Sequence, residues 1–122
     1  MKNIFAFAVI AALASPTVAQ AHESAEGPNG GPSIDTGEFH IEAVTKGTEL
    51  AIYVRDTADK PVLTDGFKGT AIFVVDGKPQ RIVLTPAGEN RLSGTSAAPL
   101  ASPKGAVQIS TGDGKSIQGK FE

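Results

Sequence analysis

The sequence predicts an all-β protein: a small antiparallel β-sandwich of about seven short strands, preceded by a cleaved signal peptide and a flexible N-terminal arm. Apolar and polar residues alternate with a period of two in several runs, as they do in half-buried strands. Glycine, proline and asparagine separate these runs at the spacing of tight turns. No run after residue 21 has the 3.6-residue period of an amphipathic helix. Two packed sheets would cover the apolar faces of that many strands.

The first 21 residues have the three-part layout of a secretory signal peptide. Lys2 supplies positive charge, residues 4–14 form an apolar stretch, and Pro16 ends it before a small-residue cleavage motif that closes at Ala21. The apolar stretch is too short to cross a bilayer about 30 Å thick. We therefore expect export to the bacterial periplasm and a mature chain that begins at His22 and does not span the membrane.

Residues 22–37 are expected to form a flexible, extended arm, because five Gly or Pro residues fall within residues 27–32. The β-sandwich domain is expected to span residues 38–122. It begins with two strictly alternating runs, residues 38–45 and 48–55. The tight turn that Lys46 and Gly47 predict between them makes this pair the clearest hairpin in the chain.

Five further strands complete the expected domain. The first of them is a more continuous apolar run, typical of a strand buried on both faces, and Asp76-Gly77 after it predicts a hairpin turn. The others are shorter and are separated by turns and loops rich in Gly or Pro. These strands are expected at residues 68–75, 80–85, 91–95, 106–111 and 115–121.

The composition excludes several classes of function. The chain carries 11 basic and 13 acidic side chains, a formal net charge of −2, so there is no overall electrostatic reason to expect nucleic acid or an anionic membrane surface as a partner. It has no Cys, and its single Met is residue 1. Thiolate zinc sites, blue-copper sites, Met-rich copper(I) sites and thiol catalysis are therefore excluded.

We expect no enzymatic activity. The sequence has no nucleophile elbow, no zinc-protease helix motif and no phosphate-binding loop. Its Gly clusters lie where hairpin turns are predicted. Asp56 and Asp59 share a loop, but the Gly and terminal Glu of a calcium-binding EF-hand are missing, so an ordinary solvated turn is the better interpretation.

The two histidines supply the one candidate site. After cleavage His22 would offer its α-amine and its own imidazole to one metal ion, a chelate that suits Cu(II), with Zn(II) behind it. His40 lies on the polar face of the run over residues 38–45, and Glu38 and Glu42 flank it with carboxylate oxygens. The alternative is that both histidines are incidental, one in a frayed end and the other on an ordinary polar surface.

Several short motifs resemble a known group of proteins. They are Gly27-Pro28-Asn29-Gly30-Gly31-Pro32, Glu38-Phe39-His40-Ile41-Glu42, Tyr53-Val54-Arg55-Asp56 and the run from Leu84 to Leu92. The sequence is similar here to small periplasmic proteins associated with heavy-metal efflux, and to an N-terminal all-β portion of the adaptor (membrane fusion) subunits of RND-type metal efflux pumps. This resemblance implies a periplasmic role in metal handling and an efflux-pump component as partner. It also points to His22 and His40 as the candidate metal-binding positions.

The chain departs from that pattern in two ways. Where relatives often carry a His-rich stretch before the Gly-Pro-Asn-Gly-Gly element, it has only His22. It also lacks the coiled-coil and lipoyl-like portions of a full adaptor. We predict a non-enzymatic carrier or buffer of Cu(II) or Zn(II), with ligands from His22, His40, Glu38 and Glu42. The alternative is a metal-independent interaction module that docks on an envelope efflux assembly.

Overall fold

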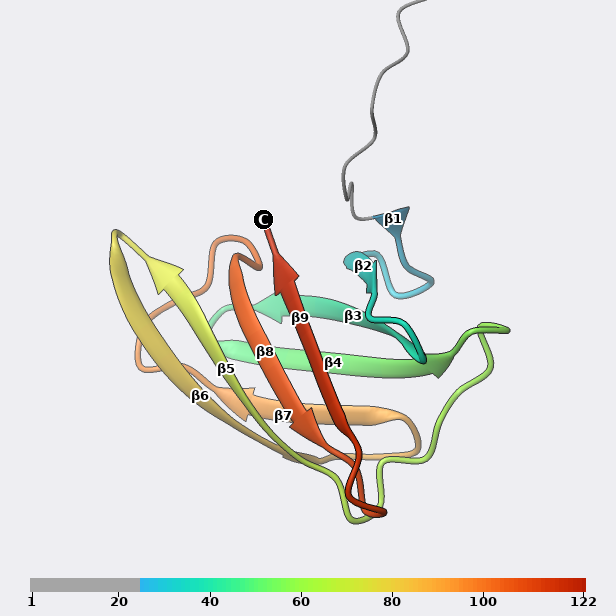
Figure 1. Ribbon diagram of the computed structural model, residues 1–122. Helices are drawn as coiled ribbons and strands as arrows, with labels where there is room; N and C mark the ends of the chain where they lie inside the picture. Colours follow the sequence, from blue (N-terminus) through green and yellow to red (C-terminus); the bar gives the residue numbers. More distant parts are fainter. Residues whose placement is uncertain (1–24) are drawn as a thin grey trace, which may run out of the picture.

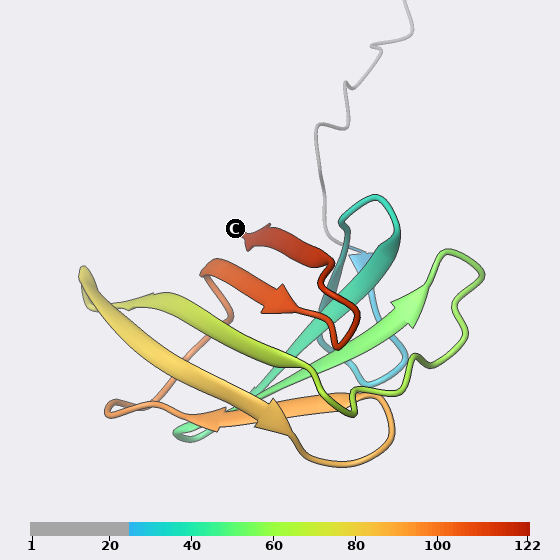
Figure 2. The same ribbon diagram turned by 60° about the horizontal axis from the view of Figure 1, so that its bottom comes forward.

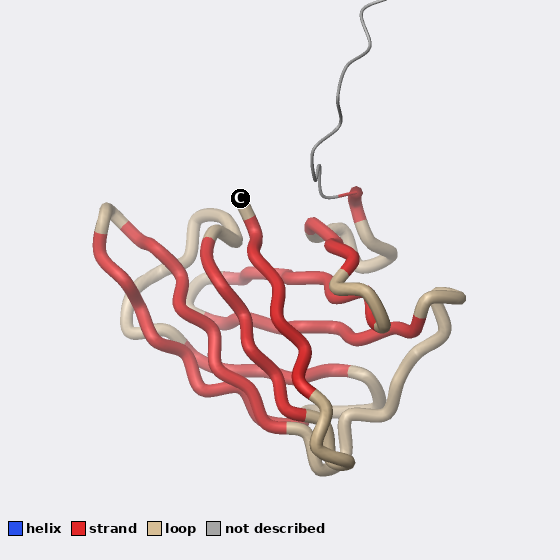
Figure 3. The backbone as a smooth tube through the Cα atoms, in the orientation of Figure 1, coloured by secondary structure: helices blue, strands red, loops and turns tan. Residues whose placement is uncertain are grey.

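Nine antiparallel strands form one continuous sheet in the computed structural model, which describes residues 25–122 (Figure 1). The residues described contain strands, turns and loops and no helix, so the expected all-β class is confirmed (Figure 3). The strands are β1 (Ala25–Glu26), β2 (Pro32–Asp35), β3 (Phe39–Lys46), β4 (Glu49–Asp56), β5 (Lys68–Val75), β6 (Lys78–Pro86), β7 (Arg91–Thr95), β8 (Gly105–Ser110) and β9 (Ser116–Phe121).

All seven predicted strands are present as β3 to β9, with ends that differ by no more than two residues. The structure differs in the expected arm, residues 22–37, of which residues 25–37 are described. Here β1 and β2 form a short hairpin, and β2 pairs with β3 through Ser33, Ile34 and Asp35. The Gly and Pro residues of this segment form the turn of the hairpin instead of a free arm.

The predicted arrangement as two separate stacked sheets is replaced by a single curled sheet. Its strand order is β1-β2-β3-β4-β7-β6-β5-β8-β9. One half, β5, β6, β8 and β9, lies across the other half, β3, β4 and β7, and the two halves cross at a large angle (Figures 1 and 2). The sheet stays continuous because β6 pairs with β5 along most of its length and then with β7 through Thr85 and Pro86.

The core lies between the two halves of the curled sheet. Buried residues alternate with more exposed ones along β6, β8 and most of β4, as the period-two pattern predicts. The expectation that residues 68–75 are buried on both faces is wrong, because Ala71 and Phe73 of β5 are buried whereas Ile72 and Val74 are exposed. Phe73 on β5 and Phe121 on β9 meet edge to face, with ring centroids 6.3 Å apart. The other fully buried side chains include Ile41, Leu50, Ile52, Val54, Ile82, Leu84, Leu92, Val107 and Ile109.

Residues 1–24, which include the expected signal peptide and His22, lie outside the described part of the chain. Within residues 25–122 there is no helix of the length and apolarity that a membrane span needs.

Gly94 on β7 allows the close approach that the bend of β6 requires. A Cβ atom at this position would lie 2.3 Å from the backbone oxygen of Val83 and 2.6 Å from Cγ2 of Ile82. A glycine inside a strand often marks a place where another stretch of backbone approaches closely. The contact with Val83 cannot relax by a rotamer change, since its atom belongs to the backbone of the bending strand.

We therefore predict that Gly94→Ala destabilises the fold by about 2–3 kcal/mol, as overpacking in a closely packed strand does. Gly112→Ala is the matched control, because its Cβ would meet no atom closer than 3.5 Å, and we expect a change within about 0.5 kcal/mol. Urea unfolding followed by circular dichroism measures both changes. Equal free energies of unfolding for the two variants would contradict this account of Gly94.

Candidate functional site

The structure separates the predicted ligands of β3 instead of gathering them. Glu38, directly before β3, is exposed and lies 3.5 Å from Nζ of Lys115. His40 is half-buried, and Glu42 is completely buried. His22 lies outside the described residues. The alternation of β3 correctly predicts one face for His40 and Glu42, but the β1–β2 hairpin covers only the Glu42 end of that face.

Glu42 is surrounded by hydrogen-bond donors from its own chain. Its Oε2 accepts from the backbone N–H groups of Asn29 at 2.9 Å and Gly31 at 3.0 Å. Its Oε1 accepts from Nδ2 of Asn29 at 3.0 Å and from Nη1 of Arg55 at 3.1 Å. Two donors on each oxygen use the acceptor capacity of a carboxylate. Glu42 therefore has a structural role here, and it does not fit the ligand role expected for it.

The Gly-Pro-Asn-Gly-Gly motif is the turn that wraps this carboxylate. The turn is closed by two backbone hydrogen bonds, from Gly27 N–H to Gly31 O at 2.7 Å and from Gly30 N–H to Gly27 O at 3.0 Å. A Cβ on Gly31 would lie 2.0 Å from the carbonyl oxygen of Ala43 on β3. Only glycine lets the turn lie this close to the strand, so the motif has a packing reason that does not depend on a ligand.

Arg55 links the buried carboxylate to the rest of the site. It lies directly opposite His40 in the β3–β4 register. Its Nη1 donates to Glu42, and its Nη2 donates to Oγ of Ser33 at 3.0 Å. Its buried Nε has no hydrogen-bond partner among residues 25–122, and Oδ1 of Asp59 is 3.6 Å from it. The guanidinium thus holds β2, β3 and β4 together while one N–H remains directed toward Asp59.

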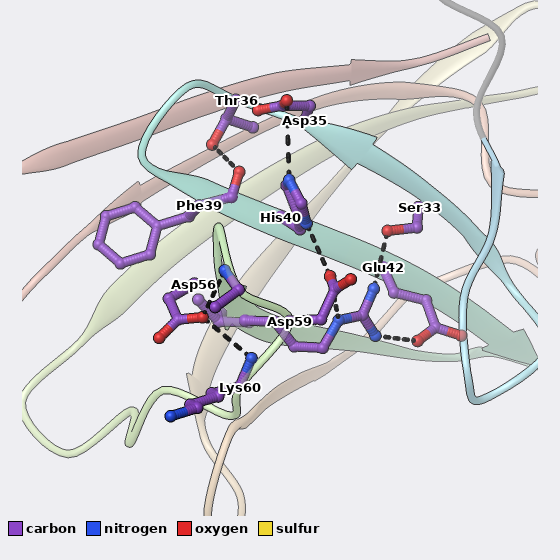
Figure 4. A network of polar contacts seen from close by, with 12 residues as sticks. Ser33, Asp35, Thr36, Phe39, His40, Glu42, Asp56, Asp59 and Lys60 are labelled. Atoms are coloured by element: carbon purple, nitrogen blue, oxygen red, sulfur yellow. Dashed lines mark hydrogen bonds and ion pairs between the residues drawn. The ribbon is translucent and has the colours of Figure 1, made fainter.

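The ring of His40 lies between two carboxylates (Figure 4). Its Nδ1 is 2.8 Å from Oδ1 of Asp59, and its Nε2 is 3.6 Å from Oδ2 of Asp35. An ionised carboxylate can only accept, so the hydrogen bond with Asp59 places a proton on Nδ1. Nε2 is then the nitrogen that can act as a ligand, and Asp35 on β2 lies beside it.

The loop after β4 holds Asp59 in place. Oδ1 of Asp56 accepts from the backbone N–H groups of Ala58 and Lys60, both at 2.9 Å. Asp59 adopts a left-handed backbone conformation with φ of 61°, which is uncommon for a residue other than glycine. The hydrogen bond from His40 holds the pKa of Asp59 below its usual value of 3.8, with further lowering from Arg55. Asp59 therefore keeps its negative charge at neutral and mildly acidic pH.

These side chains line a cleft of about 950 Å³ between the β1–β2 hairpin and the end of β9. Asp35, His40, Arg55 and Asp59 form one wall, and Lys120 and Glu122 belong to the opposite side. Ala25, the first described residue, also lines the cleft. The described part of the chain therefore begins at this cleft.

The donor set fits a divalent metal ion only in part. Among residues 25–122 no three His, Asp or Glu side chains are grouped closely enough to hold an ion. Two donors do converge, Nε2 of His40 and Oδ2 of Asp35 at 3.6 Å. Ligands about 2.1 Å from a tetrahedral zinc ion are about 3.4 Å apart. This pair therefore has the spacing of two tetrahedral ligands, whereas Glu38 and Glu42 are engaged elsewhere.

Sequence reasoning did not find Asp35, Arg55 or Asp59. Arg55 could have been placed opposite His40 from the hairpin register alone. Asp35 requires the pairing of β2 with β3, which the Gly- and Pro-rich segment hides. Asp59 reaches His40 from a loop 19 residues along the chain, and no local pattern indicates that contact.

We predict that Glu42→Ala destabilises the protein by about 3–5 kcal/mol, because it leaves the buried Arg55 charge and three further donors without their acceptor. Hydrogen exchange at the Asn29 and Gly31 amides should rise with it. Glu49→Ala, on the exposed start of β4, is the control and should change the free energy of unfolding by less than about 0.5 kcal/mol. A Glu42→Ala variant as stable as the control would show that the buried pair is dispensable.

Neither a scan against protein-family models nor searches of curated proteins and of solved structures finds a match to this chain. The resemblance to metal-efflux adaptors thus rests on the short motifs alone, and one of them, Gly-Pro-Asn-Gly-Gly, has a structural role around Glu42.

Proposed function

We propose that this protein binds one divalent metal ion in the periplasm and buffers it or hands it on, as a non-enzymatic component of heavy-metal resistance. The observation that carries the proposal is the pair formed by Nε2 of His40 and Oδ2 of Asp35, 3.6 Å apart in an open cleft. Asp35 takes the place first expected for Glu38 or Glu42.

Asp59 acts in this proposal as a positioning residue. Metal-binding histidines commonly donate their second ring N–H to a carboxylate, which fixes the tautomer and strengthens the ligand. Asp59 makes that contact with Nδ1 of His40 at 2.8 Å. The two flanking carboxylates also favour a cation beside the ring. A proton on Nε2 and a metal ion at Nε2 would compete for the same place.

His22 would complete the ligand set. Ala25 lines the cleft that contains His40, and the three residues from His22 to Ala25 can span at most about 11 Å. If cleavage makes His22 the N-terminus, its amine and imidazole can supply two nitrogen ligands near His40 and Asp35. Three nitrogens and one oxygen form a set that both Zn(II) and Cu(II) accept.

The separation of the two described donors favours Zn(II). A tetrahedral ion keeps its ligands about 3.4 Å apart, close to the 3.6 Å between Nε2 of His40 and Oδ2 of Asp35. Adjacent ligands of a square-planar Cu(II) ion would be about 3 Å apart. Cu(II) would therefore require Asp35 to move toward the ring.

Calorimetric titration of the chain beginning at His22 tests the proposal. We expect one Zn(II) per chain with a sub-micromolar Kd. His40→Ala should weaken binding at least 100-fold, and Asp59→Asn should weaken it about 10- to 100-fold, as loss of a contact that orients a ligand does. Glu38→Ala is the matched control and should stay within twofold, since that carboxylate faces Lys115. Weak, non-stoichiometric uptake would contradict the proposal.

Blocking the N-terminus tests the contribution of His22 separately. Acetylation of the chain that begins at His22 removes the amine as a ligand but leaves His40 and Asp35 in place. We expect the Kd for Zn(II) to rise at least tenfold. Equal affinity of the acetylated and free chains would exclude the N-terminal amine from the site.

Acidification should weaken binding, because imidazole and amine ligands must lose their protons before they bind a metal ion. Imidazole groups protonate at a pKa of about 6.5 in model peptides. Affinity for Zn(II) should therefore fall steadily as the pH drops below about 6.5. Calorimetry in buffers across this range measures the change, and a pH-independent Kd would contradict histidine ligation.

The alternative function, metal-independent docking on an envelope efflux assembly, differs in its response to chelation. Association with a pump component that is equally strong with and without a chelator favours the docking module. Association that requires Zn(II) favours a carrier.

A further inference from the structure

The outer face of β5, β6, β8 and β9 is exposed across four neighbouring strands. The register places Arg81, Ile72, Ala106 and Lys120 side by side in one row, one residue from each strand. The next row in one direction contains Val83, Thr70, Gln108 and Gln118. No described element covers this face, which lies on the side opposite the core.

Within the described part of the chain, three of the four exposed large apolar side chains lie on this face. Ile72, Val74 and Val83 are 48%, 45% and 61% exposed. Ile72 and Val83 are diagonal neighbours across the β5–β6 pair, and Val74 is two residues beyond Ile72 on the same face. Scattered apolar residues are normal on a surface, whereas a contiguous group on one sheet face indicates an interaction site.

Cations surround this apolar group. Lys68, Arg81 and Lys120 lie on the same face, and Lys104 precedes β8 with its carbonyl bonded to the backbone of Val74. Glu122 is a carboxylate beside them, 3.6 Å from Nζ of Lys120. Within residues 25–122, Lys68, Arg81 and Lys104 form no ion pair. This excess of positive charge occurs in a chain whose net charge is −2.

The face also has a groove of about 520 Å³ over β5, β8 and β9. It forms because the small side chain of Ala106 lies between the larger Ile72 and Lys120 in the row described above. Strands are spaced about 4.8 Å apart, so Arg81 and Lys120 at the ends of that row are about 14 Å apart. An extended chain covers nearly the same distance, about 13 Å, in four residues.

We propose that this face binds an extended segment of a partner protein with the pattern Glu-x-aliphatic-x-Glu. Residues two apart in an extended chain point the same way. The aliphatic side chain would enter the groove beside Ala106 and contact Ile72. The two carboxylates would reach Arg81 at one end of the row and Lys120 at the other. A flat anionic membrane would meet the same cations but would leave the groove beside Ala106 unfilled.

The test uses three synthetic peptides with blocked ends and the isotope-labelled chain that begins at His22. The first peptide, Ser-Glu-Thr-Ile-Thr-Glu-Ser, has the proposed pattern. The second, Ser-Thr-Glu-Ile-Glu-Thr-Ser, has the same composition with the carboxylates moved inward. The third, Ser-Lys-Thr-Ile-Thr-Lys-Ser, reverses the charge. In an NMR titration the first peptide should cause saturable chemical-shift changes centred on Ile72, Ala106 and Val83. The second peptide should bind at least threefold more weakly, and the third should cause no shift changes.

Variants of the face separate its charge from its apolar surface. Arg81→Glu and Ile72→Thr should each weaken binding of the first peptide at least tenfold, and Arg81→Lys should retain it within threefold. The controls are Lys46→Glu at the β3–β4 turn and Leu63→Thr, which alters the fourth exposed apolar side chain, in the loop before β5. Both controls should bind like the unmodified chain, and all variants should keep its melting temperature within about 3 °C.

Two outcomes would overturn the proposal. One is a failure of the peptide to recognise this face: either the first peptide shows no saturable binding, or the control variants weaken its binding as much as Arg81→Glu does. The other is binding to vesicles of 70% phosphatidylcholine and 30% phosphatidylglycerol, abolished by Arg81→Glu, with no binding of the peptide. That second result would make the face a membrane-docking surface.

Discussion

The ion pair between Glu42 and Arg55 is the interaction on which the candidate site of this molecule depends. A carboxylate with no exposed surface must be matched by donors, and Glu42 obtains four of them from Arg55 and from the turn that contains Asn29 and Gly31. These donors attach the β1–β2 hairpin to β3 and β4. Asp35 is carried by that hairpin, so its position beside His40 follows from the buried pair.

Much of the fold follows from local patterns in the sequence. Alternation of apolar and polar residues predicts most of the strands because each strand buries one face, and the burial of β6 and β8 follows it closely. It fails at Glu42 and Arg55, which are buried beside core residues, and on β5, where the apolar Ile72 and Val74 are exposed. The two-sheet arrangement could not be excluded in the same way. Whether β6 pairs with one neighbour or with two depends on a bend near Val83 and Gly94, and an alternating pattern carries no information about bends.

The candidate site was predictable to a smaller extent. The spacing of β3 correctly places His40 and Glu42 on one face, but it cannot show that a turn of small residues covers Glu42 and leaves His40 in a cleft. The turn was expected to be free because Gly and Pro disfavour regular structure. In fact the absence of side chains lets the backbone amides of this turn approach the carboxylate. The same residues that weaken a strand thus provide a set of hydrogen-bond donors.

The shared strand β6 has a consequence for how the molecule unfolds. β6 pairs with β5 in one half of the sheet and with β7 in the other. Without β6, each half would therefore lose the hydrogen-bonded neighbour of one of its strands. The described core is likewise one cluster drawn from both halves. The two halves therefore cannot behave as separate cooperative units, and opening of one should expose the apolar face of the other. Folding of residues 25–122 is accordingly expected to be a single all-or-none transition, although the strands of the two halves of the sheet run in different directions.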